Sequence, residues 1–372
     1  MPILVPVLVV FPMLVLLAAW HWRQKQQADQ KRIAAEKKRL DAERAKLAAQ
    51  KEVEQLRKTW QIDPSELQLK ECIWRGAVGE VFRGRWRDMV VAVKTVRGIC
   101  MTNEEMEKEL DHEATTLQKV RHAHVVQFFG AGTLEDGTPF MVVELMELGT
   151  LRSMLHNAGT ELDWPTRQRF VREAALGMAL VHSLGHMHRD LKSDNILVSI
   201  VAGRMQIKVA DFGTATLATL ASASVARESM VPLSPAERVA TTGRRTKRVG
   251  TPLWMAPEVL AGERTYGKSA DVYSFGIVMW EVAARCYPWE EVQDADLLDA
   301  LLCLITSGQR PAVDSEWPDG YVAVMRQCWA TDPQNRPTFD QVAVQLKLEE
   351  VRLLAAVDFC ASRSYGMIVL AW

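Results

Sequence analysis

The hydrophobic pattern of this chain changes type between residues 146 and 150, and this change constrains the fold more than any other feature. Before it, the apolar residues fall in short β-rich runs: VVAVKTV at 90–96, HVVQFFGAG at 124–132 and PFMVVELM at 139–146. One helical stretch, at about 103–120, interrupts these runs, and helical spacing dominates from about residue 150 onward. The pattern predicts an α+β fold with a small β-rich lobe over 67–146, a larger helical lobe over 150–349, and a cleft between them.

The first 22 residues form the most apolar part of the chain. MPILVPVLVVFPMLVLLAAW at 1–20 carries no charge, and about 20 apolar residues can cross a bilayer as a helix. Trp20 and Trp22 resemble interfacial anchors, and Arg23 and Lys25 follow, so the positive-inside bias predicts a single-pass transmembrane anchor over 1–22 with the remaining chain in the cytoplasm. A cleaved signal peptide is the alternative, but it lacks a basic start and a clear cleavage site. Pro12 is expected to kink the membrane helix.

Residues 23–60 are rich in Ala, Lys, Glu, Gln and Arg and contain no Gly or Pro, which predicts a helix. Ile33, Leu40 and Leu47 repeat every seven residues, and the next step falls on Glu54. This stripe is consistent with a coiled coil and a homodimer, and equally with a solvated helix beside the membrane. The excess of Lys and Arg could also hold the segment against an anionic lipid surface. Asp63-Pro64 is expected to end the helix. The globular domain is then predicted at 62–350, with a tail at 351–372.

Composition gives no support to several classes of function. The net charge of −1 over 372 residues gives no reason to expect a nucleic-acid partner. The six cysteines are scattered without a CxxC pair, so neither a disulfide framework nor a zinc site is predicted and a reducing compartment fits best.

The stretch HMHRDLKSDNILV at 186–198 crowds charged and amide side chains ahead of an apolar run. VADFG follows at 209–213. Earlier in the chain, RGAVGEVFRG places Gly76 and Gly79 in a turn where backbone N–H groups can approach a phosphate. Lys94 in VAVK adds a cation to an apolar strand, and Glu113 in the predicted helix could orient it.

Taken in order, G-x-x-G-x-V, VAVK, Glu113, HRDLKSDN, DFG and APE resemble the motif series of eukaryotic protein kinases over residues 67–349. The resemblance implies a bilobal protein kinase fold whose β-rich lobe carries one regulatory helix. HRDLKSDN, GTPLWMAPEV, DVYSFGIVMWEV and CWATDPQNRPTF are similar to the tyrosine-kinase-like group of serine/threonine kinases, which includes relatives of Raf and the mixed-lineage kinases. The implied function is transfer of the ATP γ-phosphate to Ser or Thr hydroxyls of protein substrates in signalling.

The resemblance also implies residue roles. Asp190 would accept the proton of the substrate hydroxyl, Lys192 would reach the γ-phosphate, and Lys94 would bind the α- and β-phosphates with Glu113 as its partner. Asn195 and Asp211 would hold Mg2+. The implied ATP contacts are Gly76, Gly79, Val81, Ala92, Lys94, Glu144, Met146 and Leu197. Val143 would be the gatekeeper.

Two further side-chain sets are implied by the same resemblance. One is a stacked column that would link the lobes, formed by Leu117, Phe128, His188 and Phe212. The other is a buried ion pair between Glu258 and Arg336.

The chain departs from the kinase pattern in two places. Trp74 replaces the first loop glycine, where an indole would crowd the ribose or swing outward; this residue alone favours the alternative of a pseudokinase scaffold. The segment from Asp211 to Glu258 is long and rich in Ser, Thr and Ala. It is interpreted either as a disordered insertion or as an activation segment ordered by phosphorylation, with Arg189 as the phosphate partner. The candidate acceptors are Thr242, Thr246 and Ser234, and Thr251 would lie beside the substrate hydroxyl.

Overall fold

The computed structural model describes the backbone of residues 4–75, 79–96, 114, 117–211, 252–261, 267–290 and 303–352. Within these ranges, side chains are described from residue 17 onward, except at 49, 50, 52, 53, 56, 57, 96 and 252. The chain divides into two compact units, Met1–Thr59 and Trp60–Trp372. Each unit is described by itself.

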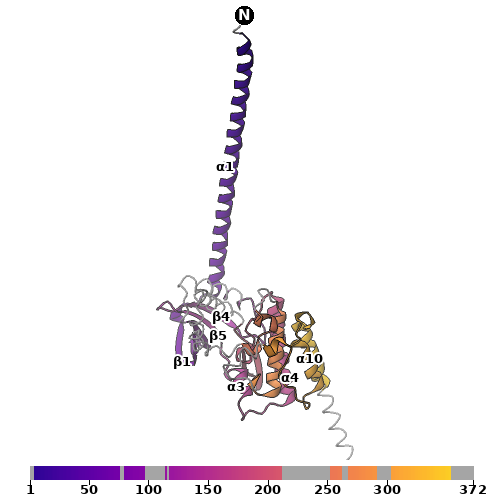
Figure 1. Cartoon of the computed structure of the whole chain (residues 1–372). Helices are drawn as coiled ribbons and strands as arrows, with labels where there is room; N and C mark the ends of the chain where they lie inside the picture. The colour runs from indigo at the N-terminus through magenta and orange to yellow at the C-terminus, as the bar shows by residue number, and fades with distance from the viewer. Residues whose placement is uncertain are drawn as a thin grey trace, which may run out of the picture. The chain divides into compact units, whose positions relative to one another are not determined.

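The first unit consists of helix α1, Leu4–Trp60, whose last residue already belongs to the second unit (Figure 1). The helix runs without interruption through Pro12. It ends before Asp63-Pro64, as predicted, because the Asp63 carboxylate caps the short 3-10 helix η1 (Pro64–Glu66) by accepting the Ser65 N–H at 2.9 Å.

Among the described residues, no helix carries an apolar stretch long enough to cross a bilayer. The transmembrane anchor predicted at 1–22 falls mostly on residues whose side chains lie outside the described part. It stays a prediction.

The second unit begins with a five-stranded antiparallel sheet in the order β1-β2-β3-β5-β4. The strands are β1 (Leu67–Arg75), β2 (Gly79–Trp86), β3 (Met89–Val96), β4 (Phe128–Thr133) and β5 (Pro139–Glu144). Alternating residues of β3 and β5, among them Val91, Val93 and Val142, form a hydrophobic cluster on one face of the sheet. The predicted strand at 90–96 is confirmed, the run at 139–146 is a strand as far as Glu144, and the run at 124–132 becomes a strand only from Phe128. Its first part instead bonds to the helical lobe, through Val126 N to Val209 O and Val209 N to His124 O, both 2.9 Å.

Residues 60–62 cover β4 at the edge of this sheet. Gln61 forms a parallel bridge with Ala131, and Ile62 donates its N–H to Ala131 O at 2.8 Å. A Cβ atom added at Gly130 would lie 2.4 Å from Trp60 O, so only glycine lets the two backbones approach this closely. Trp60 and Ile62 are 3% and 4% exposed. The globular unit therefore begins at Trp60, two residues before the predicted start at 62.

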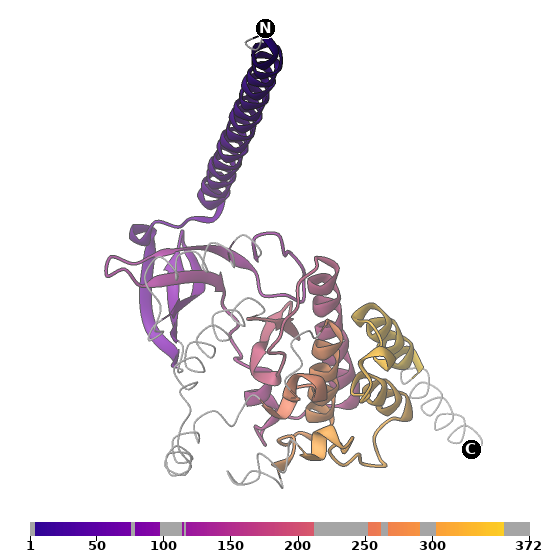
Figure 2. The same ribbon diagram turned by 45° about the horizontal axis from the view of Figure 1, so that its top comes forward.

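The helical lobe follows the sheet in the chain and lies beside it (Figure 2). Its main helices are α3 (Leu151–Leu155), α4 (Trp164–Ser183), α7 (Pro257–Leu260), α8 (Ser269–Ala284) and α10 (Asp319–Cys328). The strands β6 (Ile196–Val201) and β7 (Arg204–Val209) form a two-stranded ribbon. In the chain, this ribbon follows α4 and precedes α7. The predicted α+β arrangement of a β-rich lobe followed by a helical lobe is confirmed. Most of the predicted helix at 103–120 lies outside the described residues.

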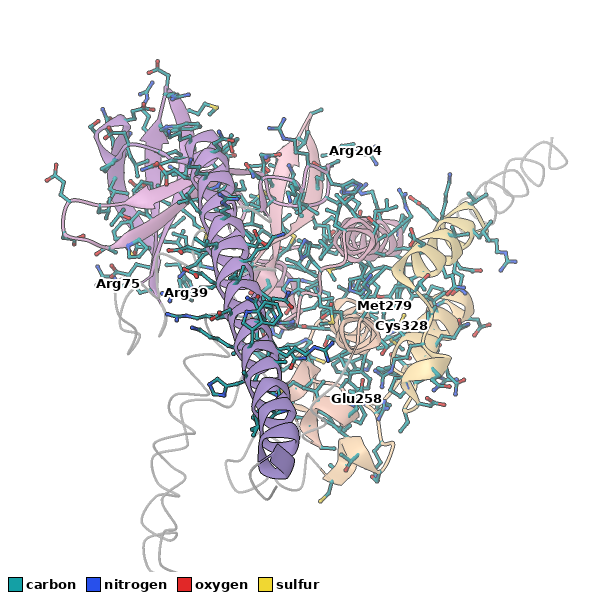
Figure 3. All side chains as sticks on the ribbon, turned by 90° about the horizontal axis from the view of Figure 1, so that it is seen from above. Arg39, Arg75, Arg204, Glu258, Met279 and Cys328 are labelled. Atoms are coloured by element: carbon teal, nitrogen blue, oxygen red, sulfur yellow. The ribbon has the colours of Figure 1, made fainter. Side chains whose placement is uncertain are left out.

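Helix α8 is the central element of the helical lobe, because nearly all of its side chains are buried. It packs against α10, where Tyr321 donates its hydroxyl to Met279 O at 2.6 Å; Met279 of α8 and Cys328 of α10 are labelled in Figure 3. Burial raises the pKa of Tyr321 well above its ordinary value, so this hydroxyl stays protonated and keeps its role as a donor.

Candidate active site

Lys94 lies on the face of the sheet opposite the hydrophobic cluster. It pairs with Val81 of β2 and with Met141 of β5, and Ala92 of the same strand pairs with Val143. Because directly paired residues in antiparallel strands share a face, Val81, Ala92, Lys94 and Val143 all point to the same side. Three of the predicted ATP contacts are thereby brought together on one surface.

The stretch 188–195 forms a compact polar loop that ends in the 3-10 helix η2 (Ser193–Asn195). Lys192 Nζ donates to Asp190 Oδ2 at 2.7 Å. Asn195 Nδ2 donates to the backbone oxygen of Asp190 at 2.7 Å and to its Oδ2 at 3.1 Å. The Asp190 carboxylate is thus held by a cation and an amide while its side chain remains 31% exposed.

The helical lobe and the sheet meet at Asp211, two residues after the end of β7. Its Oδ1 accepts a hydrogen bond from Lys94 Nζ at 2.7 Å. Partial desolvation favours the neutral carboxyl, but the charge and the hydrogen bond of Lys94 outweigh it and lower the pKa of Asp211 below its ordinary value. Asp211 also has a left-handed backbone, with φ of 59°. Such a conformation is costly for a residue with a side chain and is concentrated at functional sites.

The loop before Asp190 is anchored by the buried carboxylate of Asp271 on α8. Its Oδ2 accepts the His188 N–H, and its Oδ1 accepts the Arg189 N–H, each at 2.8 Å. His182 Nε2 lies 2.8 Å from Oδ2. Burial would raise the pKa of Asp271, yet the hydrogen bonds from His182 and His188 lower it, so the anchor is ionised. Arg189, at φ of 65°, is held in a second left-handed conformation.

The loop after Asp190 is anchored by a second carboxylate of α8, Glu281, whose side chain is fully buried. Ser193 donates its hydroxyl to Glu281 Oε1 at 2.6 Å, and Trp254 donates its indole N–H to Oε2 at 3.2 Å. His156 Nε2 lies 3.4 Å from Oε1. One side chain therefore joins the polar loop to η4 (Pro252–Trp254), the first described element after residue 211.

The segment that joins the two lobes packs as a small cluster. Met146, Val126 and Ala210 are buried together, with Val143 and Leu197 against them. The cluster brings together the predicted gatekeeper Val143 of β5 and two predicted ATP contacts, Met146 between the lobes and Leu197 of β6.

Glu144 lies just before this cluster and is bound to the helical lobe. Both of its carboxylate oxygens lie 2.7 Å from Lys208 Nζ of β7. Its Oε2 also accepts the Gln127 N–H at 3.2 Å. The ion pair restrains the connection between the lobes.

Trp74 lies directly opposite Val81 in the β1–β2 register, after an irregularity between Cys72 and Trp74. It therefore points to the face that carries Lys94, rather than to the hydrophobic cluster on the other face. The residue is 54% exposed. The indole therefore lies on the side where the nucleotide is predicted to bind, and it is not part of the hydrophobic cluster on the other face.

Asn195 and Asp211 fit a divalent cation in donor chemistry. Asn195 uses its Nδ2 within the protein, so its amide oxygen remains as a ligand, and Asp211 offers a carboxylate that is 41% exposed. In the part of the chain that is described, no group of three or more His, Cys, Asp or Glu side chains could hold a metal. Mg2+ commonly takes one or two protein ligands together with phosphates and water, so the pair fits a cation that arrives with a nucleotide.

Several predicted residues lie outside the described part of the chain. These are Gly76, Glu113, Phe212, Thr242, Thr246, Ser234 and Thr251. Leu117, Phe128 and His188 of the predicted column are buried, and the column itself stays a prediction without Phe212. The Glu258–Arg336 pair is confirmed: Nη1 lies 2.6 Å from Oε1 and Nη2 lies 2.9 Å from Oε2.

The sequence analysis missed three residues that shape the site: Asp271, Glu281 and Lys208. The first two carry a signal in the sequence, because a carboxylate within the apolar helical run 270–283 must be paired to be buried. Lys208 carries none, since a lysine on an amphipathic strand is equally common at the surface.

Comparison of the sequence with known proteins identifies the family of this chain. The sequence profile described as protein tyrosine and serine/threonine kinase matches residues 67–346. The chain belongs to the protein kinase family.

Its relatives include kinases of Dictyostelium discoideum. The chain is 36% identical over 285 residues to the probable serine/threonine-protein kinase drkD, an alignment that covers 76% of this chain and 20% of drkD. It is 33% identical over 292 residues to the probable serine/threonine-protein kinase drkC, covering 77% of this chain and 35% of drkC. The dual specificity protein kinase shkD is 32% identical over 308 residues, covering 82% and 37%. The chain thus spans well under half the length of these relatives.

Proposed function

We propose that this chain is a serine/threonine protein kinase, which transfers the γ-phosphate of ATP to Ser or Thr hydroxyls of protein substrates. The observation that carries the proposal is the convergence of Lys94, from the sheet, with Asp190, Asn195 and Asp211, from the helical lobe. Phosphoryl transfer needs positioned charges more than covalent help from the protein, and these side chains supply both signs of charge within one site.

In this proposal Asp190 orients the substrate hydroxyl and accepts its proton. Lys192, 2.7 Å from the Asp190 carboxylate, is close enough to neutralise charge that develops on the transferred phosphoryl group. Lys94 holds the α- and β-phosphates, and its ammonium also lies 2.7 Å from the Asp211 carboxylate. Asn195 and Asp211 would hold Mg2+, which when bound neutralises the phosphates.

The preference for Ser and Thr rests on two observations. Lys192 follows Asp190 by two residues, as in serine/threonine kinases, and drkD and drkC are named as probable kinases of that class. The similarity to the tyrosine-kinase-like group belongs to the same proposal. Mapping the phosphorylated residues on a generic protein substrate distinguishes Ser/Thr from dual specificity, the activity named for shkD.

The proposal includes attachment to a membrane through residues 1–22. It rests on the uncharged stretch 1–20 and the basic residues that follow it. Recovery of the full chain from the carbonate-washed membrane fraction, and its loss from that fraction when residues 1–22 are removed, is the expected result. The alternative of a pseudokinase scaffold is not supported, since each described residue of the implied catalytic set is present and in contact with another member.

The decisive experiment compares wild type with Asp190→Asn and Lys94→Met in an assay with ATP and Mg2+. We expect Asp190→Asn to lower kcat by about 10²- to 10⁴-fold while nucleotide binding persists, because the base is lost and the fold is not. Lys94→Met should abolish activity because it removes the cation that holds the α- and β-phosphates of ATP. Unchanged activity in Asp190→Asn, or a wild type that binds ATP and phosphorylates nothing, would contradict the proposal.

A further inference from the structure

Helix α1 carries an apolar stripe along one side. Ile33, Leu40 and Leu47 are 66%, 51% and 53% exposed. Their seven-residue spacing places them one above another over about 21 Å of helix. This is the spacing of one of the two seam positions in a coiled-coil heptad.

The charges beside this stripe are sorted by sign. Lys37, Arg44 and Lys51 follow the three stripe residues by four positions each. Four residues advance a helix by slightly more than one turn, so these cations form a row on one edge of the stripe.

The other edge of the stripe is acidic. Glu36 and Glu43 follow Ile33 and Leu40 by three positions, slightly less than one turn, and Asp29 precedes Ile33 by four. All six charged side chains of the two rows are exposed, and none has a hydrogen-bond or ion-pair partner among the described residues. The two rows are therefore available to a partner.

The arrangement selects the orientation of a second copy. In a parallel two-fold dimer, the partner is related by half a turn about an axis along the helices, so the basic row of each copy faces the acidic row of the other. In an antiparallel dimer, like rows face each other and repel. Interhelical charge pairs beside an apolar seam are known to set both partner choice and orientation.

We propose that α1 forms a parallel, in-register homodimer through Ile33, Leu40 and Leu47, with the basic row of each copy paired to the acidic row of its partner. The partner is a second copy of this chain because the surface is complementary to itself. The proposal does not depend on catalytic activity.

Single cysteines in the full-length chain test the proposal directly. In a parallel in-register dimer, residue 33 lies opposite residue 33 of the other copy, and residue 47 opposite residue 47. Under mild oxidation, Ile33→Cys and Leu47→Cys should each give a covalent dimer at about ten times the rate of wild type, since the dimer raises the effective thiol concentration. Wild type controls for the six native cysteines. Ala42→Cys, on the opposite side of the helix, is the matched control and should remain at the wild-type rate.

A charge exchange tests the sorted rows. Replacing Asp29, Glu36 and Glu43 together by Lys makes both rows basic, and replacing Lys37, Arg44 and Lys51 together by Glu makes both acidic. In the Ile33→Cys background each triple variant alone should lose cross-linking, and an equimolar mixture of the two should regain it. Cross-linking no faster than Ala42→Cys would overturn the dimer. Cross-linking only between Ile33→Cys and Leu47→Cys chains would overturn the parallel orientation, and equal rates in all mixtures would overturn the role of the charges.

Discussion

At the residue scale, Trp74 is the side chain that departs most from the protein kinase pattern. The β1–β2 register turns its indole to the face of the sheet that carries Lys94. No described contact ties it to Asp190 or Asp211. On the proposed function, we therefore expect it to affect the position of the nucleotide more than the transfer of the phosphoryl group.

We expect Trp74→Gly to lower the KM for ATP by about two- to tenfold, up to about 1.4 kcal/mol of binding free energy, with kcat unchanged. The physical reason is that removal of the indole opens space beside the nucleotide. Steady-state kinetics with varied ATP measure both constants. Trp74→Val is the control, because it removes the indole without the backbone freedom of glycine. A lower kcat with an unchanged KM would assign the indole to the chemical step.

The residues of the candidate site could be predicted where they belong to short motifs that occur in a fixed order along the chain, and where only one residue type can fill the role. Asp190, Asn195 and Asp211 were predicted in this way, and in the structure Asn195 contacts Asp190 while Asp211 pairs with Lys94. What could not be predicted is the support behind them. Asp271 and Glu281 act on backbone N–H groups and on a serine far away in the chain, and a sequence does not specify which distant donors will meet a buried carboxylate.

At the scale of elements, the pair of Glu258 on α7 and Arg336 after η7 (Pro333–Asn335) ties two distant parts of the helical lobe together. The two side chains are 7% and 0% exposed. Arg336 also donates to the backbone oxygens of Ala330, Thr331 and Ser269. The Glu258 carboxylate, labelled in Figure 3, is the only partner of opposite charge that the described residues provide for it.

Glu258→Ala should lower the free energy of unfolding by about 3–5 kcal/mol, because it leaves a buried guanidinium without a counter-charge. Urea denaturation measures the change. The double variant Glu258→Leu/Arg336→Met should recover part of the loss, since it removes the unpaired charge together with its partner. If the double variant is less stable than Glu258→Ala, the loss comes from packing rather than from charge.

Strand β4 depends on its glycines for the contact with residues 60–62. Gly130→Ala should destabilise the protein by about 1–3 kcal/mol, because the added methyl group would overlap Trp60 O and the Ile62 side chain. The matched control is Gly267→Ala, where an added Cβ meets nothing within 4 Å. Thermal unfolding of the two variants should differ clearly. Equal stability would mean that residues 60–62 can move away from β4 at no cost.

At the scale of the whole molecule, the boundary between the two units falls between Thr59 and Trp60. The helical composition of 23–60 predicted one continuous element but not that its last residue would be buried in the next unit. Burial of Trp60 depends on Gly130, seventy residues away, and such long-range partners are not visible in local patterns. The β-rich and helical lobes, in contrast, were predicted because their periodicities are local.

We expect a chain that starts at Trp60 to unfold at the same temperature as a chain that starts at Lys51, because the boundary between the two compact units lies between Thr59 and Trp60. A chain that starts at Asp63 should lose at least about 3 kcal/mol, since it lacks two buried side chains. Differential scanning calorimetry of the three chains decides this. Equal melting of the first and third chains would place the true boundary after Ile62.

Asp271 and Glu281 belong to one buried helix, and they hold the loop on the two sides of Asp190. If the chain is the proposed kinase, a substitution deep inside α8 is therefore expected to lower its activity without contacting ATP or a substrate. Variants that arise there in a population should be assayed for turnover even when the purified protein has a normal melting temperature. The first property to change would be the orientation of the Asp190 carboxylate.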